Sequence, residues 1–519
     1  MEAIAALIAQ AGVDGRRLRT VLAFLGDGRW WTLADLVRES ATSRRTVESL
    51  LREVELERSG DRFRLREPLI GLAGRGIAPA DPVAHLLPGH AELVARMEEL
   101  IAKAPRGRQA LDHVAATADT VVRRALLLDA RFWLDGARLL CVGDHDLTSL
   151  ATAMLHPGVE VTVVDIDERI LAYIADQADH FGLSIRTRWA DLRLGLPASA
   201  QSWADLAVTD PPYTPEGVGL FVARAVEGLR DRERGRILLA YGASERTPAL
   251  ALKVQHSLSQ LNLVNEAIYP DFNRYHGAEA IGSAADLYVL RPTTKTWPAV
   301  AARVDGFGAA IYTHGPQSVE STGSASPTAA TTGQAPGAPD VLVGEWPKDL
   351  LAKTPRARLT TWLAKPYASD PASVAIAVPA GLEAALPRLL LATRARHVQV
   401  TLAGPPRDLP TGLLSPVYEL TAEGPTVHAV RLPPPTTDSG RILRRILDNA
   451  HGKLANTWRE ALITARGDLT KKQARALVSR AAPWAGDVTV LELPAHRLRE
   501  LPAAVASSLT AADAAESPG

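Results

Sequence analysis

The fold is decided by the stretch LLCVGDHDLTSLA at residues 139–151. It begins with the apolar run Leu139–Val142 and continues with the turn Gly-Asp-His-Asp at residues 143–146. A short apolar run that is bounded by a glycine is typical of a buried strand. Cys141 lies inside this run, and we expect it to be a small buried core residue. The stretch therefore predicts a strand that ends in an acidic turn.

Strands and helices alternate along the chain from this point. The segments between the early strands have helical length and period, as in Glu168–Phe181 and Gly217–Leu229. The alternation predicts an α/β fold with a doubly wound sheet, which binds ligands at the carboxyl ends of its strands. The strand candidates are short apolar runs: Leu139–Val142, Val161–Val164, Ile185–Trp189, Leu206–Thr209, Ile237–Ala240, Val264–Ile268 and Asp286–Leu290.

Acidic residues also follow the next two predicted strands. Asp165 ends the second strand, where a carboxylate can accept hydrogen bonds from both ribose hydroxyls. Asp191 follows the third strand and can accept from an adenine amino group, whereas Asp167 is better placed to cap a helix. These turns carry neither Gly-x-Gly-x-x-Gly nor a phosphate-binding Gly-Lys-Ser/Thr loop. The pattern favours S-adenosylmethionine or its decarboxylated form, and hence a Rossmann-like sheet of the S-adenosylmethionine-methyltransferase type.

The second informative stretch is LAVTDPPY at residues 206–213. Its prolines remove backbone donors and stiffen the turn, which leaves the Asp210 carboxylate and carbonyl oxygens free to accept hydrogen bonds. An amine that attacks a sulfonium-bound carbon gains positive charge, and such acceptors stabilise that charge. Tyr213 can form one wall of the pocket by stacking or by a cation–π contact. The motif predicts group transfer to an amine.

The turn at residues 143–146 adds negative charge to the same region. A free alkylammonium is mostly protonated at neutral pH, so Asp144 and Asp146 can attract a polyamine. One carboxylate must take a proton from the attacking nitrogen or pass it to water. His145 can be that base or an ordinary packing histidine.

Composition limits the remaining possibilities. A chain of 519 residues is expected to form two or three domains. The 58 basic and 58 acidic residues give a net charge of zero, so nothing draws the whole chain to nucleic acid or to an anionic membrane. A single cysteine fits a reducing cytoplasm and excludes a Cys-based zinc site. No signal peptide, membrane span or metal is expected.

Residues 1–80 have a winged-helix pattern. Two helical segments, around residues 33–37 and 47–54, precede an alternating stretch that turns at Ser59-Gly60-Asp61. DNA binding through Arg44, Arg45 and Arg52 is one interpretation, and a packing or dimerisation module is the other. The segment contains 13 basic and 11 acidic residues, a weak basic footprint for a DNA reader.

The expected division of the chain continues beyond this unit. A catalytic domain with a helical lead-in spans 81–312, and a Gly, Ser, Thr, Pro and Ala-rich linker spans 313–340. A separate α/β domain of unknown role spans 341–508, and a frayed tail spans 509–519. Arg441, Arg444 and Arg445 can touch an anion or form a solvated helix face. The strand candidates of this last domain are 374–378, 397–402, 426–432 and 488–493.

The central motifs resemble the branched-chain polyamine synthases, the N(4)-bis(aminopropyl)spermidine synthase family. The resemblance runs from about Leu111 to Arg291 and includes LDHVAATADTVVRRALLL, GDHDLTSLA, VVDIDERIL, TDPPYT and DFNRYHG. It implies transfer of aminopropyl groups from decarboxylated S-adenosylmethionine to a spermidine-like amine, with release of methylthioadenosine. The family's acidic turn reads Gly-Asp-Asp-Asp, whereas His145 stands in the middle here, and the unit after the linker is foreign to the family.

The resemblance also implies roles for particular residues. The predicted cofactor residues are Gly143, Asp165, Ile166, Asp191 and Leu192. The predicted catalytic residues, which hold and activate the amine, are Asp144, Asp146, Asp210 and Tyr213. Asn273 and Tyr275 are expected to close the pocket.

Two other functions stay open on the sequence alone. Asp-Pro-Pro-Tyr also occurs in S-adenosylmethionine-dependent N-methyltransferases that act on nucleobases, although the neutral charge balance makes nucleic acid an unexpected partner. The third possibility is a winged-helix regulator that senses a polyamine or an adenosyl ligand. The expected partner is a polyamine or another small amine, and the sequence is compatible with a homodimer.

Overall fold

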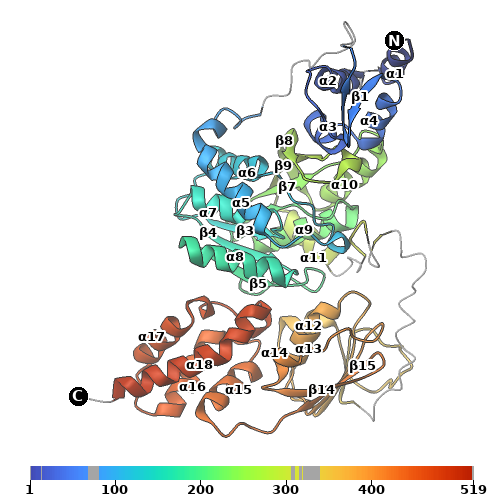
Figure 1. Cartoon of the computed structure of the whole chain (residues 1–519). Helices are drawn as coiled ribbons and strands as arrows, with labels where there is room; N and C mark the ends of the chain where they lie inside the picture. Colours follow the sequence, from blue (N-terminus) through green and yellow to red (C-terminus); the bar gives the residue numbers. More distant parts are fainter. Residues whose placement is uncertain are drawn as a thin grey trace.

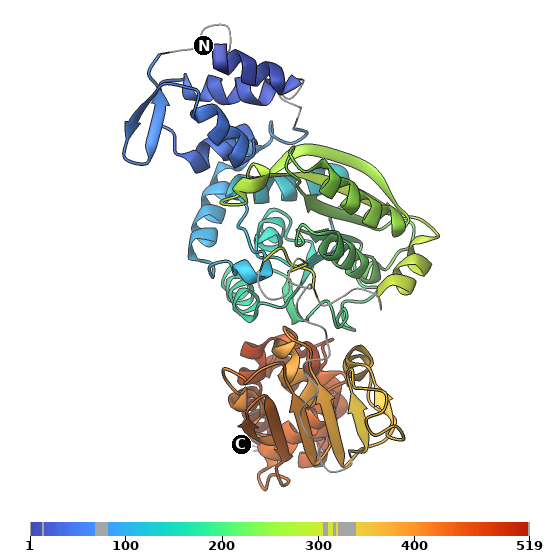
Figure 2. The same cartoon turned by 90° about the vertical axis from the view of Figure 1, so that its right-hand side faces the viewer.

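The computed structural model describes residues 2–12, 15–67, 81–304, 310–314, 318–319 and 339–516. They form three bodies, which we call the N-terminal body (before residue 68), the central body (81–319) and the C-terminal body (from 339). The central body lies between the other two (Figure 1, Figure 2). Within the described residues, no helix combines the length and the apolar character needed to cross a membrane.

The N-terminal body consists of helices followed by a hairpin. Apolar residues of the helices, such as Leu22, Leu36 and Val47, are fully buried in its core. The two helices and the antiparallel hairpin that the sequence predicted are present. The elements are α1 (Glu2–Gln10), α2 (Gly15–Leu25), α3 (Leu33–Ser40), α4 (Arg44–Leu51), β1 (Leu56–Ser59) and β2 (Arg62–Leu65).

The central body is built on a seven-stranded sheet with the order β5-β4-β3-β6-β7-β9-β8. The first five of these strands run parallel, and β9 is antiparallel to both of its neighbours, so the sheet is mixed. Every strand predicted for this region is confirmed. The strands are β3 (Arg138–Val142), β4 (Glu160–Asp165), β5 (Ile185–Trp189), β6 (Leu206–Thr209), β7 (Arg236–Tyr241), β8 (Leu263–Arg274) and β9 (Ala284–Pro292).

Helices cover both faces of this sheet. Along β3, Leu139 and Cys141 enter one hydrophobic core and Leu140 and Val142 enter the other, as the alternation of side chains along a strand requires. Cys141 is buried, as predicted. The helices on the first face are α5 (Ala91–Lys103), α6 (Ala118–Arg131), α7 (Thr148–Leu155) and α8 (Glu168–Phe181). Those on the second face are α9 (Pro215–Gly228), α10 (Pro248–Gln260) and α11 (Thr296–Val304).

The C-terminal body has a six-stranded sheet with the order β11-β10-β12-β13-β15-β14. Its strands are β10 (Val341–Val343), β11 (Arg356–Ala357), β12 (Ser373–Ala377), β13 (His397–Thr401), β14 (Tyr418–Glu423) and β15 (Thr426–Arg431). Its helices are α12 (Leu359–Ala364), α13 (Leu386–Leu391), α14 (Thr411–Leu414), α15 (Asp438–Asp448), α16 (Leu454–Arg466), α17 (Lys471–Ala481) and α18 (Ala495–Glu516).

Two expectations about this body are wrong. The stretch 488–493 is not a strand, because Thr489 and Glu492 form a capping box around a single 3-10 turn. Local side-chain bonds of this kind compete with strand pairing. The chain is also not frayed from residue 509 on, since α18 continues to Glu516 and its Ala512 is fully buried.

The predicted linker lies mostly outside the described residues. Its first two residues, however, belong to the central body. The backbone N–H and the hydroxyl of Thr313 donate to Asp112 at 2.5 and 2.6 Å, and His314 also contacts this carboxylate. The central body therefore extends at least two residues beyond the expected boundary at 312.

The C-terminal body packs on the β5 side of the central sheet. The Arg388 guanidinium from α13 lies 4.1 Å from the Trp189 ring centre and 2.6 Å from the Glu168 carboxylate. The second Glu168 oxygen accepts the N–H of Ala495 at 2.7 Å. Glu492 accepts the N–H of Ser199 at 3.0 Å. These contacts join the two bodies through polar groups that are buried, as Arg388 and Glu492 are, or half-buried, as Glu168 is.

Candidate active site

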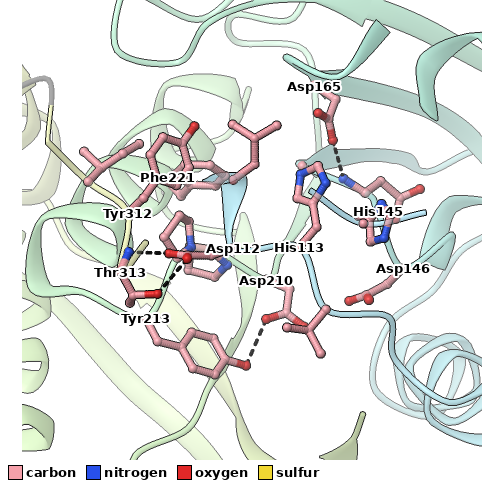
Figure 3. Close-up of a pocket in the computed structure, with 18 of the residues that line it drawn as sticks. Asp112, His113, His145, Asp146, Asp165, Asp210, Tyr213, Phe221, Tyr312 and Thr313 are labelled. Atoms are coloured by element: carbon pink, nitrogen blue, oxygen red, sulfur yellow. Dashed lines mark hydrogen bonds between the residues drawn. The ribbon is translucent and has the colours of Figure 1, made fainter. Parts of the chain in front are cut away.

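A cavity of about 600 Å³ opens at the carboxyl ends of the parallel strands. Its lining comes from the turns after β3, β4, β5 and β6 and from three more distant segments, 107–114, 278–281 and 311–314 (Figure 3). Every predicted cofactor and catalytic residue lines it: Gly143, Asp144, Asp146, Asp165, Ile166, Asp191, Leu192, Asp210 and Tyr213. The structure thus brings together side chains that lie up to 70 positions apart in the sequence.

The turn after β3 uses its first carboxylate to begin a helix. Asp144 accepts the N–H groups of Thr148 at 2.9 Å and Ser149 at 3.2 Å, at the start of α7. Gly143 has a φ of +72°, which favours glycine. A side chain here would also lie 3.3 Å from the Phe221 ring. Burial raises the pKa of Asp144 to about 7, so this carboxyl changes charge near neutral pH.

Asp165 connects the ends of β3 and β4. Its two oxygens accept the N–H groups of Asp144 at 3.0 Å and Asp167 at 2.8 Å. Burial raises the pKa of Asp165 as well. Asp167 accepts the N–H of Arg169 at 3.1 Å and caps α8, as predicted. The side chain of Ile166 adds an apolar part to the same wall of the cavity.

Asp191, at the end of β5, is paired with an arginine two residues further on. The Nε and Nη2 atoms of Arg193 lie 2.8 and 2.6 Å from its two oxygens. Arg193 also donates to the carbonyl oxygen of Gly381 in the C-terminal body at 2.8 Å. The carboxylate predicted to bind adenine is therefore already neutralised and oriented. Leu192 contributes an apolar, buried side chain beside it.

Asp210 accepts hydrogen bonds from three side chains. Tyr213 Oη donates to one oxygen at 2.9 Å, and Tyr275 Oη donates to the other at 2.7 Å. The second oxygen also accepts from Arg124 at 2.6 Å, and Arg124 reaches Asp146 at 2.8 Å. Burial raises the pKa of Asp210 to about 7, against the opposing effect of the guanidinium. One buried cation thus lies between two carboxylates.

Arg124 is a site residue that we did not predict. It is 1% exposed, and Asn273 accepts its Nε–H at 2.8 Å. Asn273 does not line the cavity, contrary to expectation, and instead orients this arginine, whereas Tyr275 does line it. The available signal was an arginine pair inside the apolar stretch VVRRALLL at 121–128, where a buried charge needs a partner.

A pair of histidines forms another unpredicted feature. The rings of His113 and His145 stack with centres 4.4 Å apart and planes 13° from parallel (Figure 3). Burial lowers the pKa of both to about 4. Among the described residues, neither Nδ1 atom has a hydrogen-bond partner. The middle of the acidic turn is therefore a neutral, aromatic surface at neutral pH. No group of three or more potential metal ligands is found in the described residues.

Comparisons with known proteins give the following matches. Residues 92–305 match the family model of the branched-chain polyamine synthase A C-terminal domain. An uncharacterised protein of Methanocaldococcus jannaschii is 39% identical over 174 residues, which are 33% of this chain and 43% of that protein. The N(4)-bis(aminopropyl)spermidine synthase of the same organism is 28% identical over 206 residues, 39% of this chain and 56% of that enzyme.

A solved structure is also similar to this chain. It is a branched-chain polyamine synthase mutein of Thermus thermophilus, in complex with N4-aminopropylspermidine and 5′-methylthioadenosine. It is 23% identical with a TM-score of 0.43, and the match covers 56% of this chain and 92% of that one. The chain spans about half the length of the curated relatives it matches.

The central body is thus an α/β protein with a ligand cavity at the carboxyl ends of its parallel strands. Its residues 92–305 match the family model of the branched-chain polyamine synthases, which confirms for this part of the chain the resemblance drawn from the sequence motifs.

Proposed function

We propose that this chain is an aminopropyltransferase. It would move an aminopropyl group from decarboxylated S-adenosylmethionine to an amine of a spermidine-like polyamine and release methylthioadenosine. The main support is that Asp210 of Asp-Pro-Pro-Tyr lines the same cavity as Asp165 and Asp191. The matched relative from M. jannaschii is named N(4)-bis(aminopropyl)spermidine synthase.

The residues at the ends of β4 and β5 fit an adenosyl ligand. Asp165 offers carboxylate lone pairs for ribose hydroxyls. Ile166, Leu192 and Phe221 supply an apolar surface for a base. When bound, the decarboxylated co-substrate supplies an electrophilic carbon next to a sulfonium. Attack there forms one C–N bond and breaks one C–S bond, whose electron pair stays with sulfur.

The choice between the carboxylated and decarboxylated co-substrate rests on Arg124. It is the one arginine or lysine among the described residues that line the cavity. A guanidinium has five N–H donors, and here all are directed to protein acceptors. Those acceptors are Asn273, Asp146, Thr148, Asp210 and Tyr275. No N–H of Arg124 remains for a methionine carboxylate, which favours the decarboxylated form.

Asp210 is suited to the proton transfer that follows attack by the amine. The nitrogen must lose a proton, and a base is most effective when its pKa is near the working pH. Burial raises the pKa of Asp210 to about 7. Tyr213 and Tyr275 fix the carboxylate from both sides. The proton would pass from the nitrogen to Asp210 and then to solvent. Asp144 and Asp146 would attract the remaining ammonium groups.

The full chain should release methylthioadenosine when incubated with decarboxylated S-adenosylmethionine and an amine from a panel of diamines and polyamines. Asp210→Asn should lower kcat by about 10²–10⁴-fold, the usual contribution of a positioned base. Asp176→Asn, on the exposed face of α8, is the matched control and should not change the rate. Absence of release with every amine of the panel would contradict the proposal.

The second candidate is an S-adenosylmethionine-dependent N-methyltransferase, because Asp-Pro-Pro-Tyr serves methyl transfer as well. Calorimetric titration with both co-substrates separates the two functions, since they differ by one carboxylate. Tighter binding of the carboxylated form would favour methylation. A winged-helix regulator that senses such a ligand ranks third.

We also propose the finer assignments that go with this function. The helix–helix–hairpin order of the N-terminal body supports a winged-helix-like domain at 1–80, and the strand order supports a Rossmann-like, methyltransferase-type domain from 81. The remaining parts would be the linker, shortened by the bonds of Thr313 and His314, and a C-terminal domain that includes α18. We expect a cytoplasmic protein with a small amine as its partner, able to form a homodimer and without affinity for nucleic acid.

A further inference from the structure

Helix α4 of the N-terminal body contacts the central body through its first turn. Ser43 Oγ and Thr46 Oγ1 both lie within hydrogen-bond distance of one Glu245 oxygen, at 2.7 and 2.8 Å. Arg44 donates to Glu279 at 2.6 Å. Ser43 is only 1% exposed. The N-terminus of α4 therefore faces protein, and a carboxylate occupies the position that favours negative charge.

The part of the central body that α4 touches is also a wall of the cavity. Ala278, Ala280 and Ile281 line the cavity. On the other side of this segment, a Cβ atom on Gly282 would lie 2.8 Å from the carbonyl carbon of Ala41. The main chain between α3 and α4 thus packs directly against the main chain of the wall.

The wall segment has an unusual backbone. Gly277, Ala278, Gly282 and Ser283 have φ values of 147°, 53°, 80° and 50°. Alanine and serine adopt positive φ rarely, and such residues persist where the surrounding structure holds them. The contacts from the N-terminal body supply part of that support.

The wall leads directly to the proposed base. The N–H of Tyr275 donates to the carbonyl oxygen of Ser283 at 3.0 Å. The hydroxyl of the same tyrosine donates to Asp210 at 2.7 Å. A displacement of residues 277–283 would therefore move a hydrogen-bond donor of Asp210 as well as the cavity surface.

The same contacts oppose a role in DNA reading. In helix-turn-helix proteins, the N-terminal residues of the second helix reach the base edges in the major groove. Here the residues at that position, Ser43 and Arg44, are bonded to Glu245 and Glu279. A duplex would have to displace the central body to reach them.

We propose that the N-terminal body is a positioning element for the cavity: α4 holds the wall segment 277–283 and, through Tyr275, the amine end of the site. The effect on the amine end of the site rests on the proposed function, whereas the support that α4 gives to residues 277–283 does not. Arg44, Ser43 and Thr46 are positioning residues, since none of them lines the cavity.

Two adjacent arginines provide the test. Arg44 contacts the wall, whereas Arg45 on the same helix is exposed and no hydrogen bond or ion pair of its side chain is found among the described residues. Three variants are compared. The first combines Arg44→Ala with Glu245→Ala. The second is the single control Arg45→Ala, and the third is the conservative pair Arg44→Lys with Glu245→Gln. The first readout is hydrogen–deuterium exchange of the amides of residues 277–283, which needs no activity.

Arg44→Ala with Glu245→Ala should raise exchange in 277–283 at least about fivefold, the factor expected for one lost ion pair or hydrogen bond. It should raise KM for the amine by a similar factor and leave KM for the co-substrate unchanged. Arg45→Ala should change neither, and the conservative pair should restore both. Unchanged exchange in the alanine variant would overturn the proposal. So would low-salt DNA binding that both arginine variants abolish. If the wild type transfers no group to any amine, the proposed function fails, but the exchange experiment still tests whether α4 holds the wall segment.

Discussion

Arg124 on helix α6 holds Asp210 at the end of β6 by an ion pair of 2.6 Å, across 86 positions of sequence. This pair connects a helix on one face of the central sheet with the Asp-Pro-Pro-Tyr motif, on which the proposed transfer to an amine rests. The same guanidinium contacts Asp146 at 2.8 Å. The charge of the cavity therefore depends on a residue outside both acidic motifs.

Replacement of Arg124 by methionine should destabilise the central body strongly. Asp146 and Asp210 would remain buried without a counter-ion, and loss of one partner of a buried ion pair costs about 3–5 kcal/mol. Calorimetric unfolding of the full chain measures the change. Arg124→Met with Asp210→Asn should regain part of the lost stability, because one of the two carboxylates is then neutral. Equal stability of wild type and Arg124→Met would contradict this role.

Asp144 should make the protein less stable as the pH rises. Its pKa is raised by burial to about 7 from a reference of 3.8, so the folded chain binds this proton more tightly than the unfolded chain. Stability therefore falls between about pH 4 and pH 7. Asparagine at this position keeps one acceptor oxygen for the N–H of Thr148 or Ser149 and does not titrate.

Between about pH 4 and pH 7, the free energy of unfolding should fall less steeply with pH in Asp144→Asn than in the wild type. The difference in slope should be about 1 kcal/mol per pH unit. Urea unfolding at pH 5, 6 and 7 checks this slope. An identical slope in both proteins would show that Asp144 does not titrate there.

The histidine pair should act in the opposite pH direction. Burial lowers the pKa of His145 to about 4 from a reference of 6.5, so the unfolded chain binds this proton more tightly. Its contribution to stability is present above pH 6.5 and is lost as the pH falls toward 4. In His145→Gln, the free energy of unfolding should fall by about 1 kcal/mol less per pH unit as the pH decreases from 6.5 toward 4. His85→Gln, at an exposed position, should leave it unchanged.

Arg388 should contribute more to the stability of the protein than Arg394, another arginine of the C-terminal body. Arg388 and Arg394 each form an ion pair, but their side chains are 3% and 53% exposed. Arg388→Met removes a charged hydrogen bond to Glu168, whose side chain is half-buried, and should cost about 1.5–3 kcal/mol. Arg394→Met removes a solvated pair with Asp370 and should cost about 0–1 kcal/mol. Calorimetry of both variants tests the difference, and equal losses would contradict it.

The sequence predicted the strands and the acids that follow them because both depend on local patterns. Apolar runs identified every strand of the central sheet, and the parallel arrangement brings their carboxyl ends together. The stretch 488–493 failed this reasoning. Four of its six residues are apolar and buried, but periodicity cannot distinguish a strand from a buried turn that Thr489 and Glu492 cap.

The partners of the acids could not be predicted in the same way. The sequence predicts that Asp165 and Asp210 are available as acceptors, yet each has protein donors, and two of the three donors of Asp210, Arg124 and Tyr275, lie far from it in the sequence. Arg124 and His113 reach the cavity only because α6 and the segment before it pack over the strand ends. Such contacts follow from tertiary packing, which the local pattern of apolar and polar residues does not predict.

Glu168 has a consequence for how the chain is made. This residue begins α8, three positions after Asp165, and its oxygens are occupied by Arg388 and by the N–H of Ala495. Ribosomes deliver the N-terminal residues first, and domains usually fold as they emerge. The start of α8 must therefore wait for more than 300 further residues to be synthesised before its last hydrogen bond can form. Until then, the Trp189 ring next to it also lacks its contact with the Arg388 guanidinium.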